Sequence, residues 1–169
     1  MRSLSKVAVA ALLALGLATA GRAQEPVNPL LPTQGTREIE LRGNFTFEPD
    51  DSYFIHGAYG PFLNQNLQVG GSLDYNKIDD FDLTTIGVFA NYHFPRASAT
   101  LPFAGVFIGF SSGDGDDTTS YGIQGGVKHF LNNNVSLNAA LVYRKFDEDI
   151  SPGEDADFGL QFGLSVYLR

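Results

Sequence analysis

Hydrophobic and polar residues alternate along most of this chain. The pattern is clearest in residues 159–169, whose even positions are large and apolar and whose odd positions are small, polar or amphipathic. Strict alternation is the period of a β-strand with two differently solvated faces. Other segments repeat the pattern between turn residues, and no helical period exceeds a turn or two. The predicted strands cover about 38–47, 52–60, 66–76, 82–94, 102–110, 120–130, 135–146 and 157–169.

These eight segments have the length that a tilted strand needs to cross a bilayer, about nine to eleven residues. We therefore predict an all-β fold, an eight-stranded antiparallel up-and-down transmembrane β-barrel. An internal repeat supports the count, because residues 52–57 recur as 120–125 and residues 62–67 recur as 130–135. The even offset of 68 keeps each residue on the same face, so the hairpin of the second and third predicted strands resembles the hairpin of the sixth and seventh. Shared turn chemistry and duplication both explain such a repeat.

Alternation alone does not say which face lies inside, since a soluble lipocalin-like barrel shows it too. The polar face here carries mainly Gly, Ser, Thr, Asn and Gln, with only a few charges, whereas a water-exposed sheet is rich in Lys and Glu. Such small groups suit the crowded interior of an eight-stranded barrel. The apolar face also carries aromatic residues near strand ends, as membrane-interface girdles do. They are Phe47, Tyr53, Tyr59, Tyr75, Tyr92, Phe94, Tyr121 and Tyr143.

The connections between the predicted strands alternate in charge. Three are nearly uncharged: 60–65, 95–101 and 131–134. The four others contain fifteen of the nineteen acidic residues: 48–51, 76–82, 111–119 and 147–157. A barrel with its N-terminus in the periplasm would place all four acidic loops at one rim, facing outside. We therefore predict a membrane barrel with its apolar face outward and acidic extracellular loops.

The beginning of the chain has the features of a secretory signal. Arg2 and Lys6 precede a continuous apolar run over residues 7–20, and small residues offer cleavage sites between Ala20 and Ala23. The run is too short for a membrane-spanning helix, although a retained anchor is the alternative. The predicted organisation is a signal peptide over 1–23, an extended and mobile proline-containing arm over 24–36, and a barrel over 37–169.

Charge and cysteine content narrow the function classes. The chain has no cysteine, so an exported domain of this size must gain its stability without disulfides. Its net charge is −8, and removing residues 1–23 takes away three basic residues and no acidic one, which leaves −11. Binding to nucleic acid needs Lys and Arg for the phosphates, so we predict no nucleic-acid partner.

The last strand also resembles the C-terminal targeting signal of bacterial outer-membrane barrels. Gln161, Gly163, Val166 and Leu168 fill its polar, glycine and two apolar places. The terminal Arg169 departs from the pattern, because such proteins often end on an aromatic residue.

Two internal phrases, residues 62–67 and 102–106, look like those of the small OmpA-type outer-membrane β-barrel family. The resemblance covers nearly all of residues 24–169. It implies a location in the bacterial outer membrane. It also implies outer-membrane lipid and lipopolysaccharide as surroundings, and the barrel-assembly machinery as a partner during biogenesis. It says little about activity, and the periplasmic peptidoglycan-binding domain of some members has no counterpart here.

Six charged residues have the parity of the polar face, and His56 shares it. Buried charges must be paired, so we predict a charge network that fills the lumen, with a gated or narrow ion path as the alternative. The six residues are Glu38, Glu40, Arg42, Asp74, Lys128 and Arg144.

No other motif indicates a cofactor, metal or catalytic site. The acidic segment 114–117 offers oxygen ligands for Ca²⁺ or Mg²⁺, but it lacks a calcium-loop signature, so a solvated rim is favoured over a divalent-cation site. The three histidines stand in no His-x-Ser arrangement. We predict a non-enzymatic structural or surface-interaction role. The alternatives are a soluble periplasmic barrel for an apolar ligand and an enzyme that modifies lipid A.

Overall fold

The computed structural model of the protein describes residues 28, 30–46, 52–78, 81–95, 98–113, 117–147 and 156–169. The predicted signal peptide over 1–23 and most of the acidic loop residues lie outside these ranges. In the described part of the chain, no helix is long and apolar enough to cross a membrane. The strands are β1 (Arg37–Thr46), β2 (Ser52–Pro61), β3 (Leu67–Ile78), β4 (Phe81–His93), β5 (Thr100–Gly113), β6 (Thr118–Asn132), β7 (Val135–Phe146) and β8 (Ala156–Leu168).

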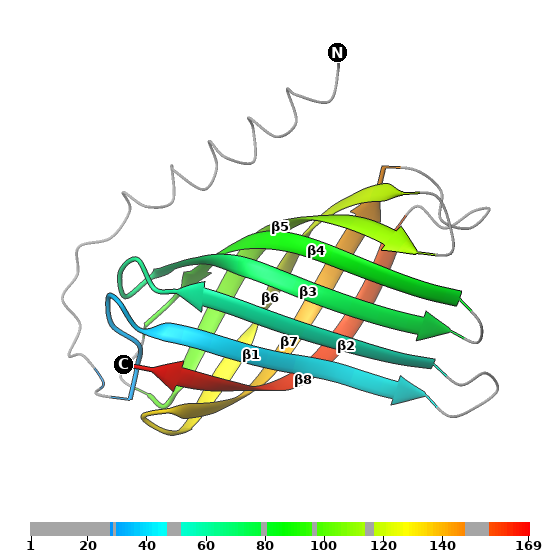
Figure 1. Ribbon diagram of the computed structural model, residues 1–169. Coiled ribbons are helices and arrows are strands. Elements are labelled where there is room, and N and C mark those ends of the chain that lie inside the picture. Colours follow the sequence, from blue (N-terminus) through cyan, green and yellow to red (C-terminus); the bar gives the residue numbers. More distant parts are fainter. Residues whose placement is uncertain are drawn as a thin grey trace, which may run out of the picture.

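The eight strands form a closed barrel in chain order, and every neighbouring pair is antiparallel (Figure 1). The first and last strands close it, with Arg37 opposite Leu168 and Gly43 opposite Phe162. Strands β5 and β6 extend beyond their predicted ends at both termini. Their ends are rich in Thr, Ser and Gly, so the alternation fades there while the ladder continues, as in the pair of Ser111 and Thr118. The predicted up-and-down barrel is confirmed.

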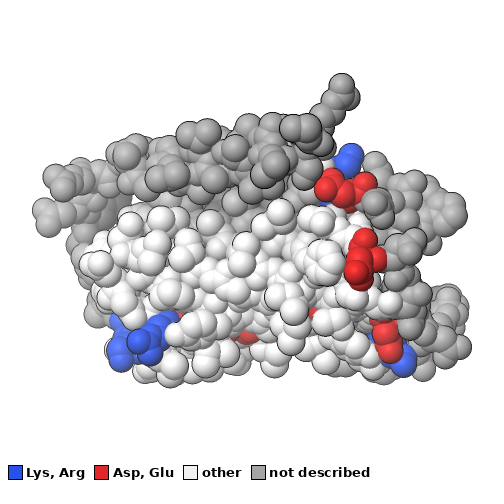
Figure 2. Space-filling model, turned by 45° about the horizontal axis from the view of Figure 1, so that its top comes forward, with Lys and Arg blue, Asp and Glu red and all other residues white. Residues whose placement is uncertain are grey.

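The two faces of the sheet differ as the alternation predicted. Large apolar side chains are exposed on the outside, whereas polar and charged side chains are buried in the lumen. Figure 2 shows a broad band of the surface almost without charge, with charged residues gathered towards the two ends. This facing is that of a transmembrane barrel, and it excludes the lipocalin-like alternative. The outward residues include Ile39, Leu41, Leu73, Ile86, Val88, Ile123, Leu160 and Phe162.

Nearly uncharged connections of at most six residues join the strands at one end, which we call the short-turn end. They lie between β2 and β3, β4 and β5, and β6 and β7, and the C-terminus ends there too (Figure 1). Residues 30–36 of the N-terminal arm lie at the same end. There Phe62 N–H donates to Thr36 O at 2.8 Å, and Gly35 N–H donates to Phe62 O at 2.9 Å. The opposite end carries the four acidic connections.

Candidate functional site

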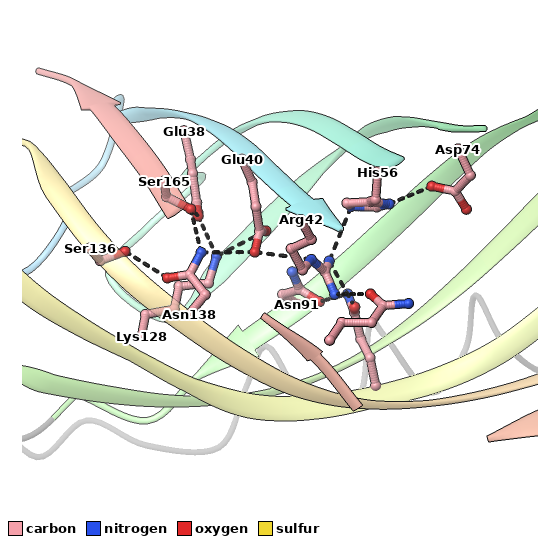
Figure 3. Close-up of polar contacts among 12 residues, drawn as sticks. Glu38, Glu40, Arg42, His56, Asp74, Asn91, Lys128, Ser136, Asn138 and Ser165 are labelled. Atoms are coloured by element: carbon pink, nitrogen blue, oxygen red, sulfur yellow. Dashed lines mark hydrogen bonds and ion pairs between the residues drawn. The ribbon is translucent and has the colours of Figure 1, made fainter. Parts of the chain in front are cut away.

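The deepest part of the lumen holds a lysine between two glutamates. Lys128 projects from β6 and has no exposed surface. Its Nζ bonds one oxygen of Glu38 and lies 3.5 Å from Glu40 Oε2, both on β1. Figure 3 shows these side chains reaching towards each other from the two strands. Because an unpaired charge is very costly in such a site, the three groups depend on one another.

Further donors hold the two glutamates. Ser165 Oγ and Tyr167 Oη, both on β8, donate to Glu38, the latter over 3.2 Å. Asn138 on β7 donates to Glu40 over 2.9 Å. The carboxylates on β1 therefore tie this strand to β7 and β8, across the seam where the barrel closes.

Arg42 occupies the middle of the lumen. Its Nε lies 3.1 Å from Glu40 Oε1, and its Nη1 donates to Gln161 Oε1 over 3.0 Å. Its Nη2 lies 3.1 Å from His56 Nε2 and 3.2 Å from Gln124 Oε1. A planar guanidinium presents several donors in one fixed fork, so this one side chain joins β1, β2, β6 and β8.

The network continues towards the acidic end through His56 and Asp74. Since Arg42 can only donate, Nε2 of His56 accepts and its Nδ1–H donates to Asp74 Oδ1. The other oxygen of Asp74 pairs with Arg144 Nη2 at 2.7 Å. We call these groups the lumen network: Glu38, Glu40, Arg42, His56, Asp74, Lys128 and Arg144.

Three amide side chains turn part of the network into a ring. Gln124 Nε2 donates to Asn91 over 2.8 Å, Asn91 Nδ2 donates to Gln68 over 3.4 Å, and Gln68 Nε2 donates to Glu38 over 2.8 Å. Together with Arg42, Glu40 and Lys128 they close a circuit around the lumen. Because its members are already bonded to one another, such a circuit favours a rigid lumen.

A small hollow lies within the part of the lumen network nearer the acidic end, where Arg42 and His56 line it. Its volume is about 30 Å³, and its lining includes Asp74, Phe89, Phe107 and Arg144. That is room for about one or two water molecules. The guanidinium of Arg144 covers the ring of Phe107 at 5.5 Å. The lumen is thus filled by side chains over most of its depth.

Below the network, towards the short-turn end, the lumen becomes apolar. His93 is fully buried between Phe62 and Phe103, with ring centroids 4.8 Å and 5.8 Å away. Within the described residues its two ring nitrogens have no hydrogen-bond partner. It lies between the ion pairs and an apolar layer formed at the mouth.

All six charges predicted from parity lie in the lumen, and each is paired with another of them. His56, which shared their parity, joins Arg42 to Asp74. The pattern of charges alone did not single out the amides Gln68, Asn91, Gln124 and Asn138, although they share the inward parity. The predicted targeting residues Gln161, Gly163, Val166 and Leu168 all lie on β8.

The described residues offer little chemistry beyond pairing. They contain no group of three His, Cys, Asp or Glu side chains that could hold a metal ion. Both ring nitrogens of His56 are engaged, by Arg42 and Asp74, so neither is left to activate a nucleophile. His129 is exposed and contacts Thr100 Oγ1 at 3.0 Å. The predicted cation segment 114–117 lies, except for Asp117, outside the described residues.

No family model matches the chain, and no curated protein matches it. Solved structures do. The N-terminal β-barrel domain of OprF from Pseudomonas aeruginosa is 18% identical, with a TM-score of 0.60 over 81% of this chain and all of that one. Neisserial surface protein A is 19% identical, with a TM-score of 0.60 over 78% of this chain and 94% of that one.

A third solved structure, the outer membrane protein OprG from Pseudomonas aeruginosa, is 10% identical, with a TM-score of 0.53 over 83% of this chain and 99% of that one. Identities this low carry the fold and not the activity. The predicted likeness is confirmed at that level: the chain has the fold of the small eight-stranded outer-membrane β-barrels.

Proposed function

We propose that this chain is a bacterial outer-membrane protein with a structural or surface-interaction role, whose lumen is closed and whose acidic loops face outside. The observation that carries the proposal is the combination of an apolar outer face with a lumen filled by paired charges. A barrel built this way anchors and presents loops, and its interior stabilises it rather than transporting a solute.

The location rests on several features taken together. The strands are 10 to 15 residues long, enough to cross a bilayer at a tilt. The predicted signal peptide over 1–23 directs export, and the four residues Gln161, Gly163, Val166 and Leu168 address the barrel-assembly machinery through β8. Outer-membrane lipid then surrounds the apolar band, and lipopolysaccharide surrounds the acidic rim.

Filling rather than conduction is favoured by the contacts of the network. Lys128 and Glu38 are almost completely buried. The hollow of about 30 Å³ lies between Arg42 and the acidic end. A conducting path would need several of these ion pairs to separate at once, and each separation leaves a charge unpaired in the lumen. In planar bilayers we expect no steady pore, and a stable open conductance would favour a channel.

Catalysis forms no part of the proposal. An enzyme that modifies lipid A needs a nucleophile, a histidine and an orienting acid near the outer rim. In the described part of the chain, His56 lies inside the lumen and its ring is occupied, whereas His93 and His129 lie towards the short-turn end. Unchanged lipid A in a deletion strain would agree with this assignment.

The acidic loops suggest divalent cations as partners. Asp82, Asp117 and Asp147 mark their described edges, and hard cations such as Ca²⁺ and Mg²⁺ prefer oxygen ligands. As the second candidate beside a solvated rim, we propose that these ions bridge the loops to the anionic headgroups of lipopolysaccharide. The bridge predicts that chelation weakens binding of the purified barrel to lipopolysaccharide, and that Mg²⁺ restores it.

The first test combines location and orientation. The protein should fractionate with the outer membrane and migrate differently on a detergent gel before and after boiling. An epitope inserted between Asp149 and Ile150 should bind antibody on intact cells. The matched epitope between Arg96 and Ala97, at a short connection, should bind only after the outer membrane is permeabilised. A soluble periplasmic protein, or the opposite epitope pattern, would overturn the proposal.

A further inference from the structure

The short-turn end of the barrel is closed by an apolar cluster to which the N-terminal arm contributes. Leu31, from the arm, is only 5% exposed. Its neighbours come from strands on different sides of the barrel, so the side chain fills the mouth rather than lying along the wall. We call this the mouth cluster: Leu31, Phe62, Leu101, Phe130 and Tyr167.

The last residue of the chain holds the arm in this position. Arg169 donates from Nη1 to Leu31 O over 3.2 Å and from Nη2 to Leu30 O over 2.5 Å. Its Nε donates to Asn133 O over 2.8 Å, in the turn between β6 and β7. One guanidinium therefore ties the arm to the C-terminus and to a turn of the barrel.

The arm is shaped to present Leu31. Asn28 begins a turn in which its carbonyl oxygen accepts from Leu31 N–H and its Oδ1 accepts from Leu30 N–H, each over 3.0 Å. A second turn follows, where Thr36 Oγ1 accepts from Thr33 N–H over 3.2 Å. Gly35, at φ 86°, takes the backbone conformation that this reversal needs.

The mouth cluster lies directly below the charged layer. Tyr167 belongs to both, because its ring packs against Phe130 with centroids 4.9 Å apart while its hydroxyl donates to Glu38. Water that entered past Leu31 would reach the pair of Glu38 and Lys128. The arm therefore protects the ion pairs that fill the lumen.

We propose that residues 30–36 are a plug for the short-turn mouth and that Arg169 is its latch. These residues are then part of the folded barrel rather than a mobile arm. The proposal also gives Arg169, which departs from the predicted targeting pattern, a role in the folded protein. Access to the lumen from the short-turn side requires the latch to open.

Single-cysteine labelling tests this cleanly, because the chain has no cysteine of its own. Leu101→Cys reports on the mouth, and Val142→Cys reports on the hollow at the other side of Arg42. Each is made in the otherwise unchanged protein and with Arg169→Gln or Leu31→Ser. Folded barrel, selected by its heat-modifiable migration, is treated with a charged thiol reagent in detergent micelles.

With Arg169→Gln we expect the Leu101→Cys site to react about tenfold faster, since the latch contributes the net worth of one to two hydrogen bonds. Leu31→Ser should accelerate it at least as much. The Val142→Cys site should keep its rate in both backgrounds. Arg37→Gln is the matched control, because it removes an exposed arginine from the same rim and should leave both sites unchanged.

Two outcomes would overturn the plug, and a third would overturn the latch alone. If neither variant accelerates the Leu101→Cys site, the arm is no plug. Equal acceleration at both reporter sites would mean that the whole barrel had loosened. Acceleration by Leu31→Ser alone would keep the plug and remove the latch. Should Leu101→Cys not fold, Ser136→Cys, which is also buried in the lumen on β7, replaces it as the mouth reporter.

Discussion

Asn66 and Asn134 make the same pair of hydrogen bonds in two different hairpins. Asn66 donates from Nδ2 to His93 O over 3.0 Å, and its carbonyl accepts from His93 N–H over 2.6 Å. Asn134 makes the equivalent bonds with Tyr167, both over 2.8 Å. The internal repeat of the sequence therefore encodes a hairpin turn that also fastens to the next strand along.

The repeat extends to the neighbours of these asparagines. Asn64 and Asn132 each accept backbone N–H bonds through Oδ1, which tightens the two turns. Phe62 and Phe130, two positions earlier, both enter the mouth cluster. Shared turn contacts and shared positions in the mouth cluster account for this part of the repeat, with or without a duplication.

Removing one of the repeated turn contacts should destabilise the barrel modestly. Asn134→Ala deletes the bond to Tyr167 O and leaves that carbonyl without its side-chain donor, which costs about 1 kcal/mol of the free energy of unfolding. Urea unfolding in lipid vesicles, followed by circular dichroism, measures it. Asn133→Ala is the control, since only its backbone carbonyl is used, by Arg169. Equal midpoints for the two variants would contradict the role of the Asn134 side chain.

The strands and their facing were predictable because one period governs them. Every second residue from Glu38 to Arg42 points inward, and the same parity holds on the other strands. Which charged side chains pair across the lumen was harder to predict from the sequence. That Lys128 meets Glu38, ninety positions earlier, depends on the register and closure of the barrel, which alternation does not fix.

The packing of the N-terminal arm also could not be predicted from the alternation of hydrophobic and polar residues. Three prolines and no alternation predicted an extended, mobile segment, and the sequence contains no sign that Leu31 would enter the mouth. Its burial depends on Phe62, Leu101 and Phe130, which come together only when the barrel closes. The domain boundary at residue 37 stays a prediction, although residues 30–36 lie against the barrel.

An inward glycine should not tolerate a methyl group. A Cβ at Gly126 would lie 2.1 Å from Ala139 O and 2.8 Å from Ala140 Cα, both backbone atoms of the adjacent strand. Gly126→Ala therefore forces β6 and β7 apart and should cost about 1–3 kcal/mol of folding free energy. The temperature at which the gel shift is lost should fall.

The matched control is Gly57→Ala, on the outward face of β2. There a Cβ meets only Leu73 O, at 3.9 Å, which is ordinary contact. This variant should keep the wild-type gel-shift temperature. A similar loss in both variants would mean that strand glycines matter here for a reason other than close approach in the lumen.

Deleting the buried lysine should be the most damaging lumen change. Lys128→Met leaves Glu38 and Glu40 as buried carboxylates with one cation removed, a loss of about 3–5 kcal/mol of folding free energy. Adding Glu38→Gln to it removes one unpaired charge, so the double variant should regain part of that loss. Both are compared by urea unfolding in lipid vesicles.

The control for charge loss is Lys77→Met. Lys77 lies towards the acidic end, 3.7 Å from Asp82, with about a third of its side chain exposed. A pair so exposed contributes about 0–1 kcal/mol, so its midpoint should barely move. If Lys128→Met changed the urea midpoint as little as Lys77→Met, the lumen network would not stabilise the barrel.

The lipid-facing side of β8 gives the sharpest test of orientation. Leu164 is 43% exposed on the outer face, so Leu164→Arg places a charge in the hydrocarbon at a cost of about 2–4 kcal/mol. Leu164→Ala keeps the site apolar and should assemble far better, as judged by the heat-modifiable band.

The next residue is no neutral control, because Ser165 is fully buried and bonds Glu38 and Asn138. Ser165→Ala should therefore reduce stability through the lumen, by about 1–3 kcal/mol for the unsatisfied partners. Indifference to arginine at position 164 would reverse the assigned faces.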